Sequence, residues 1–186
     1  MADLLSEDLA LYLVQQVARG SEEALTQLHH AYARKVYSFA FQRLGHAQWS
    51  EEVVHETFWE VWKSASKFRE ASRVSTWLFG IARLKSLELQ RQHRLDHDDI
   101  EDHQEHLVCG LPTGEMALMS EQSRDRIQQC LRTLSAAQRE CVHLVYYDDL
   151  PQADVAQALD IPVGTVKTRI MAAKEKLRLC LEEVMG

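Results

Sequence analysis

The side chains best suited to bind another molecule cluster near the carboxyl end of the chain. Two segments with helical apolar periodicity, residues 152–159 and 165–183, flank the turn Asp160-Ile161-Pro162-Val163-Gly164. Residues 162–178 contain five basic side chains and one acid, so the second segment is positively charged. Two helices joined by a tight turn, the second of them basic, predict a helix-turn-helix that binds duplex DNA through the major groove.

The second predicted helix divides its side chains between two faces. Four apolar side chains recur at intervals of four, three and four residues and form a stripe that packs inward; they are Val166, Ile170, Ala173 and Leu177. Side chains outside this stripe point towards base edges or flank them, where they reach phosphates. The predicted duplex-binding residues are Thr165, Lys167, Thr168, Arg169, Met171, Ala172 and Lys174. The alternative interpretation is an ordinary helical hairpin with a solvated basic face.

The net charge of −7 is unevenly distributed along the chain. Residues 83–94 contain four bases and one acid, and the helix-turn-helix forms a second basic segment. Residues 95–125 between them contain nine acids and one base. A uniformly acidic enzyme is not usually organised in this way, so the charge distribution allows nucleic-acid binding despite the negative total.

Helical periodicity also runs through the first half of the chain, without any competing strand-like alternation. Two predicted helices there cover residues 3–18 and 21–44. A third begins after Ser50, and a fourth is capped by Ser75 or Thr76 and runs towards Arg94. Periodicity resumes near Met116, and Ser135 with Gln138 forms a capping-box pattern that opens another helix. We therefore predict an all-α protein.

Residues 95–115 interrupt this periodicity with an acidic, histidine-rich stretch that ends in glycine and proline. The sequence therefore predicts two small helical domains, residues 1–94 and 116–186, joined by a flexible acidic linker at 95–115. We also considered that the linker acids attract the basic faces of both domains and hold them together in the free protein.

Composition indicates a cytoplasmic protein. The chain has 186 residues, of which 46% are hydrophobic and 26% charged, and no apolar run is long enough to span a bilayer. The first residues, Met1-Ala2-Asp3, are acidic where a signal peptide is basic. The four cysteines, Cys109, Cys130, Cys141 and Cys180, include no C-x-x-C pair, so we predict free thiols, three in helices and one in the linker.

Several motifs resemble those of extracytoplasmic-function (ECF) sigma factors, over residues 21–94 and 121–181. In the second domain, the segments similar to region 4 are Leu134-Ser135-Ala136-Ala137-Gln138-Arg139, Asp154-Val155-Ala156, residues 161–169 and residues 173–178. In the first domain, residues 52–63 resemble region 2.2 and Ser75-Thr76-Trp77-Leu78-Phe79-Gly80-Ile81-Ala82-Arg83 resembles region 2.4. Two motifs in the right order and at the right separation are more specific than either alone.

The resemblance implies a transcription initiation factor that binds core RNA polymerase and promoter DNA. The first domain would dock on the clamp helices of the beta-prime subunit through an acidic surface. The residues of this surface are Glu51, Glu52, His55, Glu56 and Glu60. The second domain would bind the minus-thirty-five element as duplex. The resemblance also implies control by an anti-sigma factor, often a membrane-anchored one.

The first domain would also recognise and melt the minus-ten element, because aromatic and cationic side chains suit the capture of unstacked bases. The residues expected to do so are Phe68, Arg69, Ser72, Arg73, Arg83, Lys85, Arg91 and Arg94. Four other apolar side chains of this domain are expected in the core instead; they are Phe58, Trp62, Trp77 and Ile81.

The chain departs from the family pattern at several positions. Leu84 follows Ala82-Arg83 where the family commonly has asparagine, Glu88 replaces an aspartate, and His55 stands where glutamine is common. The first helix of the predicted helix-turn-helix begins with Leu150-Pro151-Gln152-Ala153-Asp154, where Ser-Tyr and Glu are frequent. These changes leave the family assignment intact but prevent the transfer of a promoter sequence.

Two other functions remain open from the sequence. A stand-alone helix-turn-helix regulator would bind operator DNA without polymerase. A metal sensor would use linker side chains, which are His93, His97, His103, His106, Asp96, Asp98, Asp99, Asp102 and Cys109. Their spacing matches no defined ligand pattern, so we predict no metal, cofactor or small-molecule substrate. No paired carboxylates, nucleophile with a base, or phosphate loop indicates an enzyme.

Overall fold

The computed structural model describes residues 5–96 and 121–185, and every regular element in these ranges is helical. The elements are α1 (Glu7–Ala18), α2 (Glu22–Leu44), α3 (Ala47–Ser64), the 3-10 helix η1 (Ala65–Lys67), α4 (Val74–Asp96), α5 (Glu121–Arg132), α6 (Ala136–Tyr146), α7 (Gln152–Ala158) and α8 (Val163–Met185). The prediction of an all-α fold is confirmed. No helix in the described ranges is long and apolar enough to cross a membrane.

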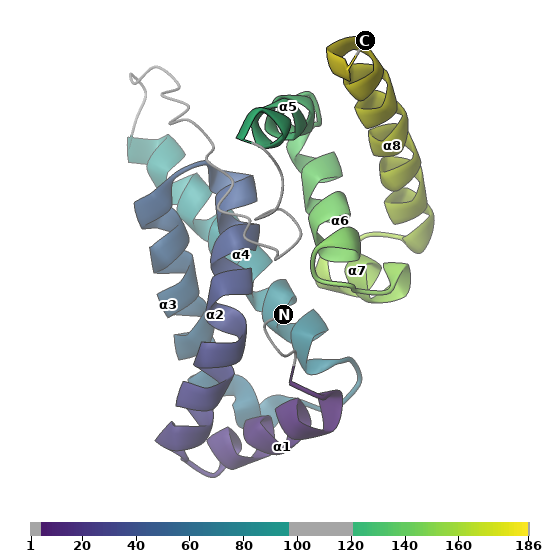
Figure 1. The fold of residues 1–186 in the computed structure, drawn as a ribbon. Helices are drawn as coiled ribbons and strands as arrows, with labels where there is room; N and C mark the ends of the chain where they lie inside the picture. Colours follow the sequence, from purple (N-terminus) through teal and green to yellow (C-terminus); the bar gives the residue numbers. More distant parts are fainter. Residues whose placement is uncertain (1–4, 97–120, 186) are drawn as a thin grey trace.

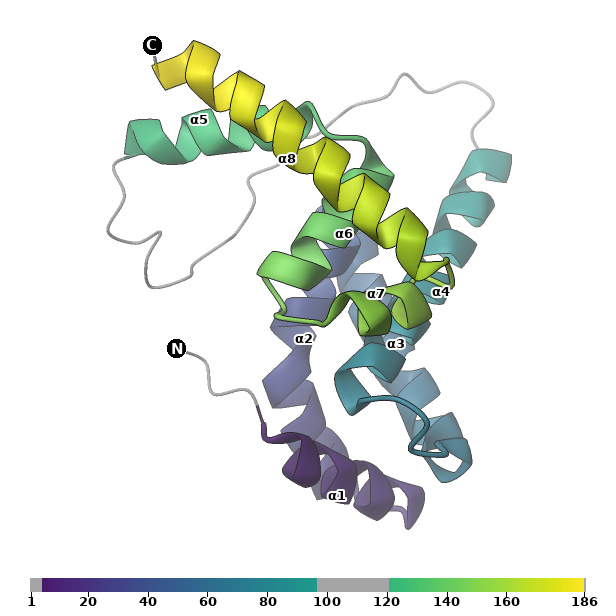
Figure 2. The ribbon, with the colours of Figure 1, turned by 90° about the vertical axis from the view of Figure 1, so that its right-hand side faces the viewer.

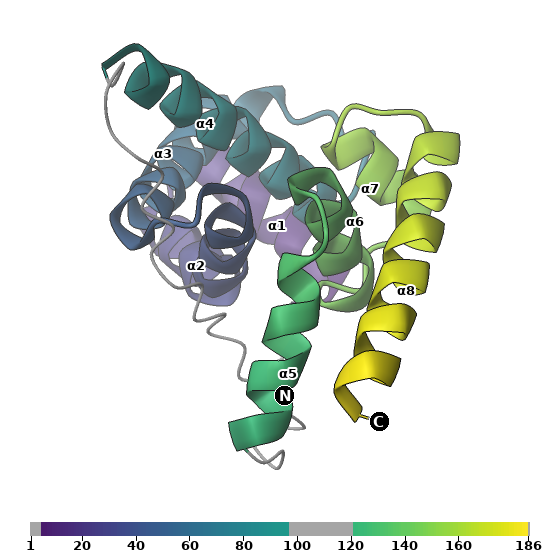
Figure 3. The ribbon, with the colours of Figure 1, turned by 90° about the horizontal axis from the view of Figure 1, so that it is seen from above.

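The helices form an N-terminal unit, α1–α4, and a C-terminal unit, α5–α8 (Figure 1). Within the N-terminal unit α2, α3 and α4 pack against one another, and α1 crosses one end of α2. In the C-terminal unit α6 and α7 pack against α2 and α4, and α8 lies on their far side from the N-terminal unit (Figures 1 and 3). The segment from 97 to 120, which contains most of the predicted linker, lies outside the described residues.

The caps predicted for α2 and α6 are present. The Ser21 hydroxyl accepts a hydrogen bond from the Ala24 N–H, and Gly45 ends α2 in a left-handed conformation with φ 67°. At α6, the Ser135 hydroxyl accepts from the Gln138 N–H while the Gln138 side chain accepts from the Ser135 N–H. These interactions are local, which is why the sequence predicts them.

The predicted starts of α3 and α4 are wrong by a few residues. α3 begins at Ala47, because the His46 ring nitrogen Nδ1 accepts the Trp49 N–H at 3.4 Å. α4 begins at Val74, whose N–H donates to the Glu7 carboxylate of α1 at 2.6 Å. The second cap comes from a residue 67 positions away, so spacing along the chain does not reveal it.

The turn between α7 and α8 has the geometry of a helix-turn-helix. Asp160 adopts a left-handed conformation with φ 50°, which aspartate tolerates better than most residues. The Ile161 N–H then donates to the Ala156 carbonyl at 3.0 Å and closes the end of α7. Val155 and Leu159 of this region are buried, and α7 packs directly against α8.

Both units contribute to one continuous hydrophobic core. Phe39 of α2 is fully buried and contacts Phe79 of α4 edge to face, with ring centroids 5.5 Å apart. The Phe39 ring also lies 6.5 Å from that of His143 in α6. The side chains predicted as core are in it, with Phe58 and Ile81 buried and Trp62 and Trp77 packed against its edge.

The prediction of free thiols is wrong for two cysteines. Cys130 of α5 and Cys180 of α8 form a disulfide, with their Cα atoms 5.6 Å apart. The two helices lie side by side (Figures 2 and 3), which brings together residues separated by 50 positions in sequence. Cys141 is a buried free thiol, and Cys109 lies outside the described residues.

We expect loss of this disulfide to destabilise the C-terminal unit. A cross-link that closes a loop of 50 residues restricts the unfolded chain, which is worth up to about 4 kcal/mol. Reduction with dithiothreitol, or the substitution Cys180→Ser, should therefore lower the midpoint of urea unfolding followed by circular dichroism. Cys141→Ala leaves the disulfide intact, so reductant should lower the midpoint of this variant by the same amount as it lowers that of the wild type. An unfolding midpoint of the wild-type protein that is insensitive to dithiothreitol would contradict the prediction.

Candidate nucleic-acid interface

The two faces predicted for the last helix are present in α8. Val166, Ile170 and Ala173 are buried against α6 and α7, and Leu177 is half-buried at the end of the same stripe. On the outer face the exposed predicted residues are Lys167, Thr168, Met171 and Lys174, and Ala172 is half-buried between them. The inner stripe therefore anchors α8 and leaves a mixed basic and apolar face open to solvent.

Several side chains on this face are held by neighbours. The Thr168 hydroxyl donates to the Gly164 carbonyl one turn earlier at 2.7 Å. The Lys174 ammonium lies over the exposed Tyr146 ring of α6, 5.4 Å from its centroid. Met171 is 69% exposed, the largest exposed fraction among the large apolar side chains of the described residues, so it is free to contact a partner.

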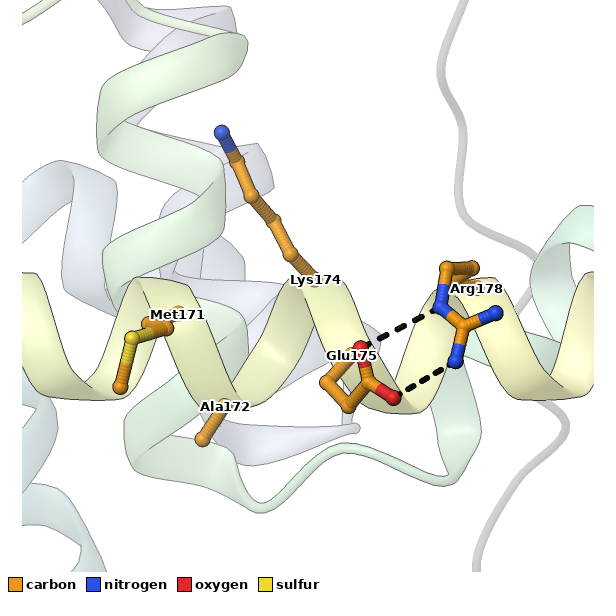
Figure 4. Close-up of a pocket in the computed structure, with 5 residues that line it drawn as sticks. All are labelled: Met171, Ala172, Lys174, Glu175 and Arg178. Carbon is orange, nitrogen blue, oxygen red and sulfur yellow. Dashed lines mark hydrogen bonds and ion pairs between the residues drawn. The ribbon is translucent and has the colours of Figure 1, made fainter.

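Met171, Ala172, Lys174, Glu175 and Arg178 line a shallow hollow along α8 (Figure 4). The guanidinium of Arg178 donates to the carboxylate of Glu175 at 2.7 and 3.2 Å and to Glu182 at 2.7 Å. These partners raise the pKa of Arg178, and the hydrogen bond from Arg178 lowers the pKa of Glu175. The acid on the outer face is therefore neutralised by its own neighbour, which lessens its repulsion of a phosphate backbone.

Two of the residues predicted to contact DNA phosphates beside the major groove are less exposed than the others. Thr165 and Arg169 are both half-buried. Burial raises the pKa of the Cys141 thiol, while a hydrogen bond with Arg169 acts in the opposite direction. Arg169 thus lies against the interior of the C-terminal unit, where it joins α8 to α6.

In the N-terminal unit, the residues predicted to capture bases lie in the loop before α4 and along that helix. Phe68 is half-buried and packs on Trp77, with ring centroids 4.8 Å apart, so it belongs to the edge of the core. Arg69 is exposed and Ser72 is half-buried. Arg73 forms an ion pair with Asp154 of α7 at 3.4 Å.

Lys85 connects the predicted DNA-binding surface of α4 with the predicted polymerase-binding surface of α3. Its ammonium lies 3.4 Å from Glu88, 3.5 Å from Glu56 and 4.0 Å from Glu60. Burial lowers the pKa of Lys85, but these three carboxylates outweigh it and raise the pKa overall. Two of the acids predicted to bind polymerase therefore already face a base predicted to bind DNA.

The other bases of α4 differ in their surroundings. Arg83 is half-buried and Arg91 is exposed, while the side chain of Arg94 lies outside the described residues. Leu84, which stands where the family commonly has asparagine, is 60% exposed between them. The sequence does show this departure, but we did not predict an exposed apolar side chain within the basic surface.

The acidic face of α3 also carries an aromatic residue that sequence reasoning missed. Glu51, Glu52 and His55 are exposed as predicted, and Trp59 lies on the same face at helical spacing with 57% of its surface exposed. The Lys63 ammonium lies 5.8 Å from the centroid of its ring. Tryptophan is enriched among the side chains that contribute most to protein–protein binding, so Trp59 is a candidate contact for a protein partner. The sequence could have revealed this, because Trp59 lies outside the apolar stripe that was predicted to be buried on this helix.

The described residues contain no group of three or more histidine, cysteine, aspartate or glutamate side chains suited to a metal ion. His93 was one of the residues considered as metal ligands. Its ring stacks on that of Trp49, with the two ring centroids 4.1 Å apart. Asp96 ends α4, and the other candidates, residues 97–109, lie outside the described residues.

Comparison with known families matches both units of the chain. The model described as Sigma-70 region 2 matches residues 28–95, and the model described as Sigma-70, region 4 matches residues 124–177. The chain is 29% identical to the ECF RNA polymerase sigma factor SigK of Mycobacterium ulcerans (strain Agy99), over 95% of each protein. It is 28% identical to the ECF RNA polymerase sigma factor SigW of Bacillus subtilis (strain 168), over 92% of this chain and 96% of SigW.

Two solved structures have similar folds. CnrH, in complex with the cytosolic domain of CnrY, matches with a TM-score of 0.67 at 22% identity, over 94% of this chain and 98% of CnrH. The sigma factor RpoE from Bartonella quintana, in complex with the anti-sigma factor NepR, matches with a TM-score of 0.67 at 25% identity. That match covers 84% of this chain and 96% of RpoE.

We expect Lys167→Ala to weaken binding of duplex DNA by the full chain. The Lys167 side chain is exposed on the outer face of α8, where a phosphate contact releases counterions. Its loss should lower the slope of log affinity against log salt by about 1, measured by fluorescence anisotropy at several salt concentrations. The matched control is Lys176→Ala, since Lys176 lies on another side of α8 and hydrogen bonds to Gln138. Equal slopes for both variants would contradict the assignment of this face.

Proposed function

The chain belongs to the extracytoplasmic-function sigma factors, and we propose that its two units bind the two elements of a promoter on core RNA polymerase. The observation that carries the proposal is that one chain matches both sigma regions in order, over residues 28–95 and 124–177. An initiation factor of this kind binds and positions nucleic acid and polymerase without catalysing a reaction itself. A stand-alone regulator would need only the C-terminal unit, so the match to region 2 favours the sigma factor.

In this proposal α8 binds the minus-thirty-five element in the major groove of duplex DNA. Its buried stripe fixes the helix on α6 and α7, so the outer face is presented as a rigid surface. Lys167 and Lys174 supply charge for phosphates, and Met171 supplies an apolar contact of the kind that distinguishes thymine by its methyl group.

The loop before α4 and the exposed side of α4 would bind and melt the minus-ten element. Arg69, Arg83 and Arg91 supply the positive charge that follows a single strand. Because Phe68 packs on Trp77, we assign it to the support of this loop rather than to stacking on a base. Leu84 is the exposed apolar side chain on this surface.

The acidic face of α3, centred on Trp59, would dock on a basic surface of core polymerase, which the family places on the clamp helices of the beta-prime subunit. Glu51 and Glu52 are exposed at one end of this face. Glu60 is held by Lys63 at 2.8 Å, and this hydrogen bond lowers the pKa of Glu60. The face therefore combines an aromatic anchor with acids that remain charged.

An anti-sigma factor is the proposed regulator. RpoE of Bartonella quintana, which shares 25% identity with this chain, was solved in complex with the anti-sigma factor NepR. Competition for the α3 face or for α8 would be enough to prevent initiation, because each proposed surface serves a separate step.

We expect the protein to confer new start sites on core RNA polymerase. Run-off transcription on fragmented host DNA, with and without the protein, followed by sequencing of transcript ends, should yield discrete starts that share two upstream elements. Lys167→Ala should lower the yield of these transcripts, because it removes a proposed phosphate contact. Specific duplex binding by the protein alone, with no polymerase-dependent initiation, would favour the stand-alone regulator instead.

Neutralising the acids at the start of the α3 face should slow association with core polymerase. We expect the double variant Glu51→Gln/Glu52→Gln to associate about tenfold more slowly at low salt, because steering by charge acts mainly on the association rate. Surface plasmon resonance on immobilised core enzyme measures this rate. Glu22→Gln/Glu23→Gln removes two exposed acids from α2 as the matched control. A similar rate for both double variants would exclude the α3 face as the docking surface.

A further inference from the structure

The two units meet through ion pairs that all have the same polarity. In the described residues three ion pairs cross between the units: Lys35 with Asp148, Arg43 with Glu140, and Arg73 with Asp154. Every base belongs to the N-terminal unit and every acid to the C-terminal unit. The C-terminal unit thus presents acids of α6, α7 and the turn between them to the N-terminal unit, while five of its bases belong to α8, which lies at the far side (Figures 1 and 3).

The pair between Arg43 and Glu140 is largely enclosed by the two units. Arg43 lies near the end of α2 and donates through its Nη1 atom to the Glu140 carboxylate of α6. The Glu140 side chain is 6% exposed and that of Arg43 is 15% exposed. Removal of either partner would leave the other charge largely shielded from water, which is costly while the two units remain packed.

A second contact surrounds Asp148, in the turn between α6 and α7. Its two carboxylate oxygens lie 3.5 Å from the Lys35 ammonium and 3.3 Å from Nε2 of His143. Burial raises the pKa of Asp148 to about 7 and lowers the pKa of His143 to about 4. The distance to Lys35 exceeds the roughly 2.7–2.9 Å of a strong charge-assisted hydrogen bond, so this pair is a weak attachment between the two units.

The third contact reaches the proposed DNA-binding loop. Asp154 of α7 pairs with Arg73, immediately before α4. Nearby, a Cβ atom built on Gly80 of α4 would lie 3.8 Å from the Ala158 carbonyl oxygen of α7, so the two helices approach closely. The C-terminal unit therefore packs directly on the element proposed to bind the minus-ten DNA.

This packing is too compact for both promoter elements to be bound at once. α4 and α8 both pack on α7, and packed helices have axes about 8–10 Å apart, which places α4 and α8 within about 20 Å of each other there. The minus-ten and minus-thirty-five elements are centred about 25 base pairs apart, or about 85 Å along B-DNA. The units must separate before α4 and α8 can bind their elements together.

The ion-paired part of the interface is suited to separation, although the two units also share apolar contacts. Buried ion pairs gain little over their cost of desolvation, so these three pairs hold the units less firmly than apolar contacts of the same extent would. Polar atoms of Arg43, His143, Asp148 and Asp154 are buried without a well-aligned hydrogen bond among the described residues. Separation would return these atoms to water, which offsets part of the attraction that is lost.

We propose that the contacts of Arg43 with Glu140, Lys35 with Asp148, and Arg73 with Asp154 form a latch that holds the free sigma factor closed and that opens on core RNA polymerase. The proposal rests on the proposed function, since the open form is the one that spans a promoter. Its partner surface is within the chain: the acidic side of α6 and α7 binds the basic side of α2 and the loop before α4. The linker tether considered from the sequence lies outside the described residues, and the latch does not depend on it.

A charge reversal and its compensating swap test the latch. Arg43→Glu places two acids against each other and should open the full-length protein, which small-angle X-ray scattering detects as an increased radius of gyration. The double variant Arg43→Glu/Glu140→Arg restores opposite charges and should be as compact as the wild type. Arg34→Glu makes the same charge change at an exposed position on the same helix and should leave the protein compact. Circular dichroism on each variant establishes that its helices are folded.

The same variants should differ in their affinity for core polymerase. If the open form makes up about a tenth of the free protein, its full release in Arg43→Glu raises the apparent affinity about tenfold, and the swap reverses the gain. A folded Arg43→Glu variant that is as compact as Arg34→Glu would overturn the latch, as would a swap variant that stays open. If Arg43→Glu is expanded but no form of the protein binds core polymerase, the three contacts still hold the free protein closed, while the opening on core polymerase and the proposed function both fail.

Discussion

The positions of both units depend on the burial of one helix, α2, which contacts helices of each unit. α2 packs against α1, α3, α4 and α6, and Phe39 on it touches the rings of Phe79 and His143 from opposite units. Its apolar side therefore makes the core of the N-terminal unit, while Lys35 and Arg43 form its contacts with the C-terminal unit. The proposed minus-ten surface, polymerase-binding face and latch all take their positions from the packing of this helix.

Features determined by short-range interactions could be predicted from the sequence. The Ser21 cap, the capping box at Ser135 and the buried stripe of α8 each depend on residues within one to three helical turns, and each has the predicted geometry. The family resemblance was accessible for the same reason, because its motifs are contiguous segments. The outer face of α8 was predicted as the complement of that stripe, with Lys167 and Met171 exposed as expected.

The features that the sequence did not reveal depend on contacts between distant segments. Glu7 caps α4 from α1, and the disulfide joins Cys130 to Cys180 across 50 residues. The sequence did not predict that Lys85 of α4 pairs with Glu56 and Glu60, because these acids lie on another helix, α3. Hydrophobic periodicity says which face of a helix is buried, but not which other helix covers it, and so it leaves such partners unidentified.

The separation of charge within the C-terminal unit also explains how a protein with a net charge of −7 can bind DNA. Glu140, Asp148 and Asp154 face the N-terminal unit, while four bases of α8 are exposed to solvent; they are Lys167, Lys174, Lys176 and Arg178. In the closed form those acids are paired with bases, so they weaken the field of α8 less than their number suggests. Opening exposes acids and bases in equal number. The gain in promoter binding therefore has to come from the distance the two units can then span, and not from a change in net charge.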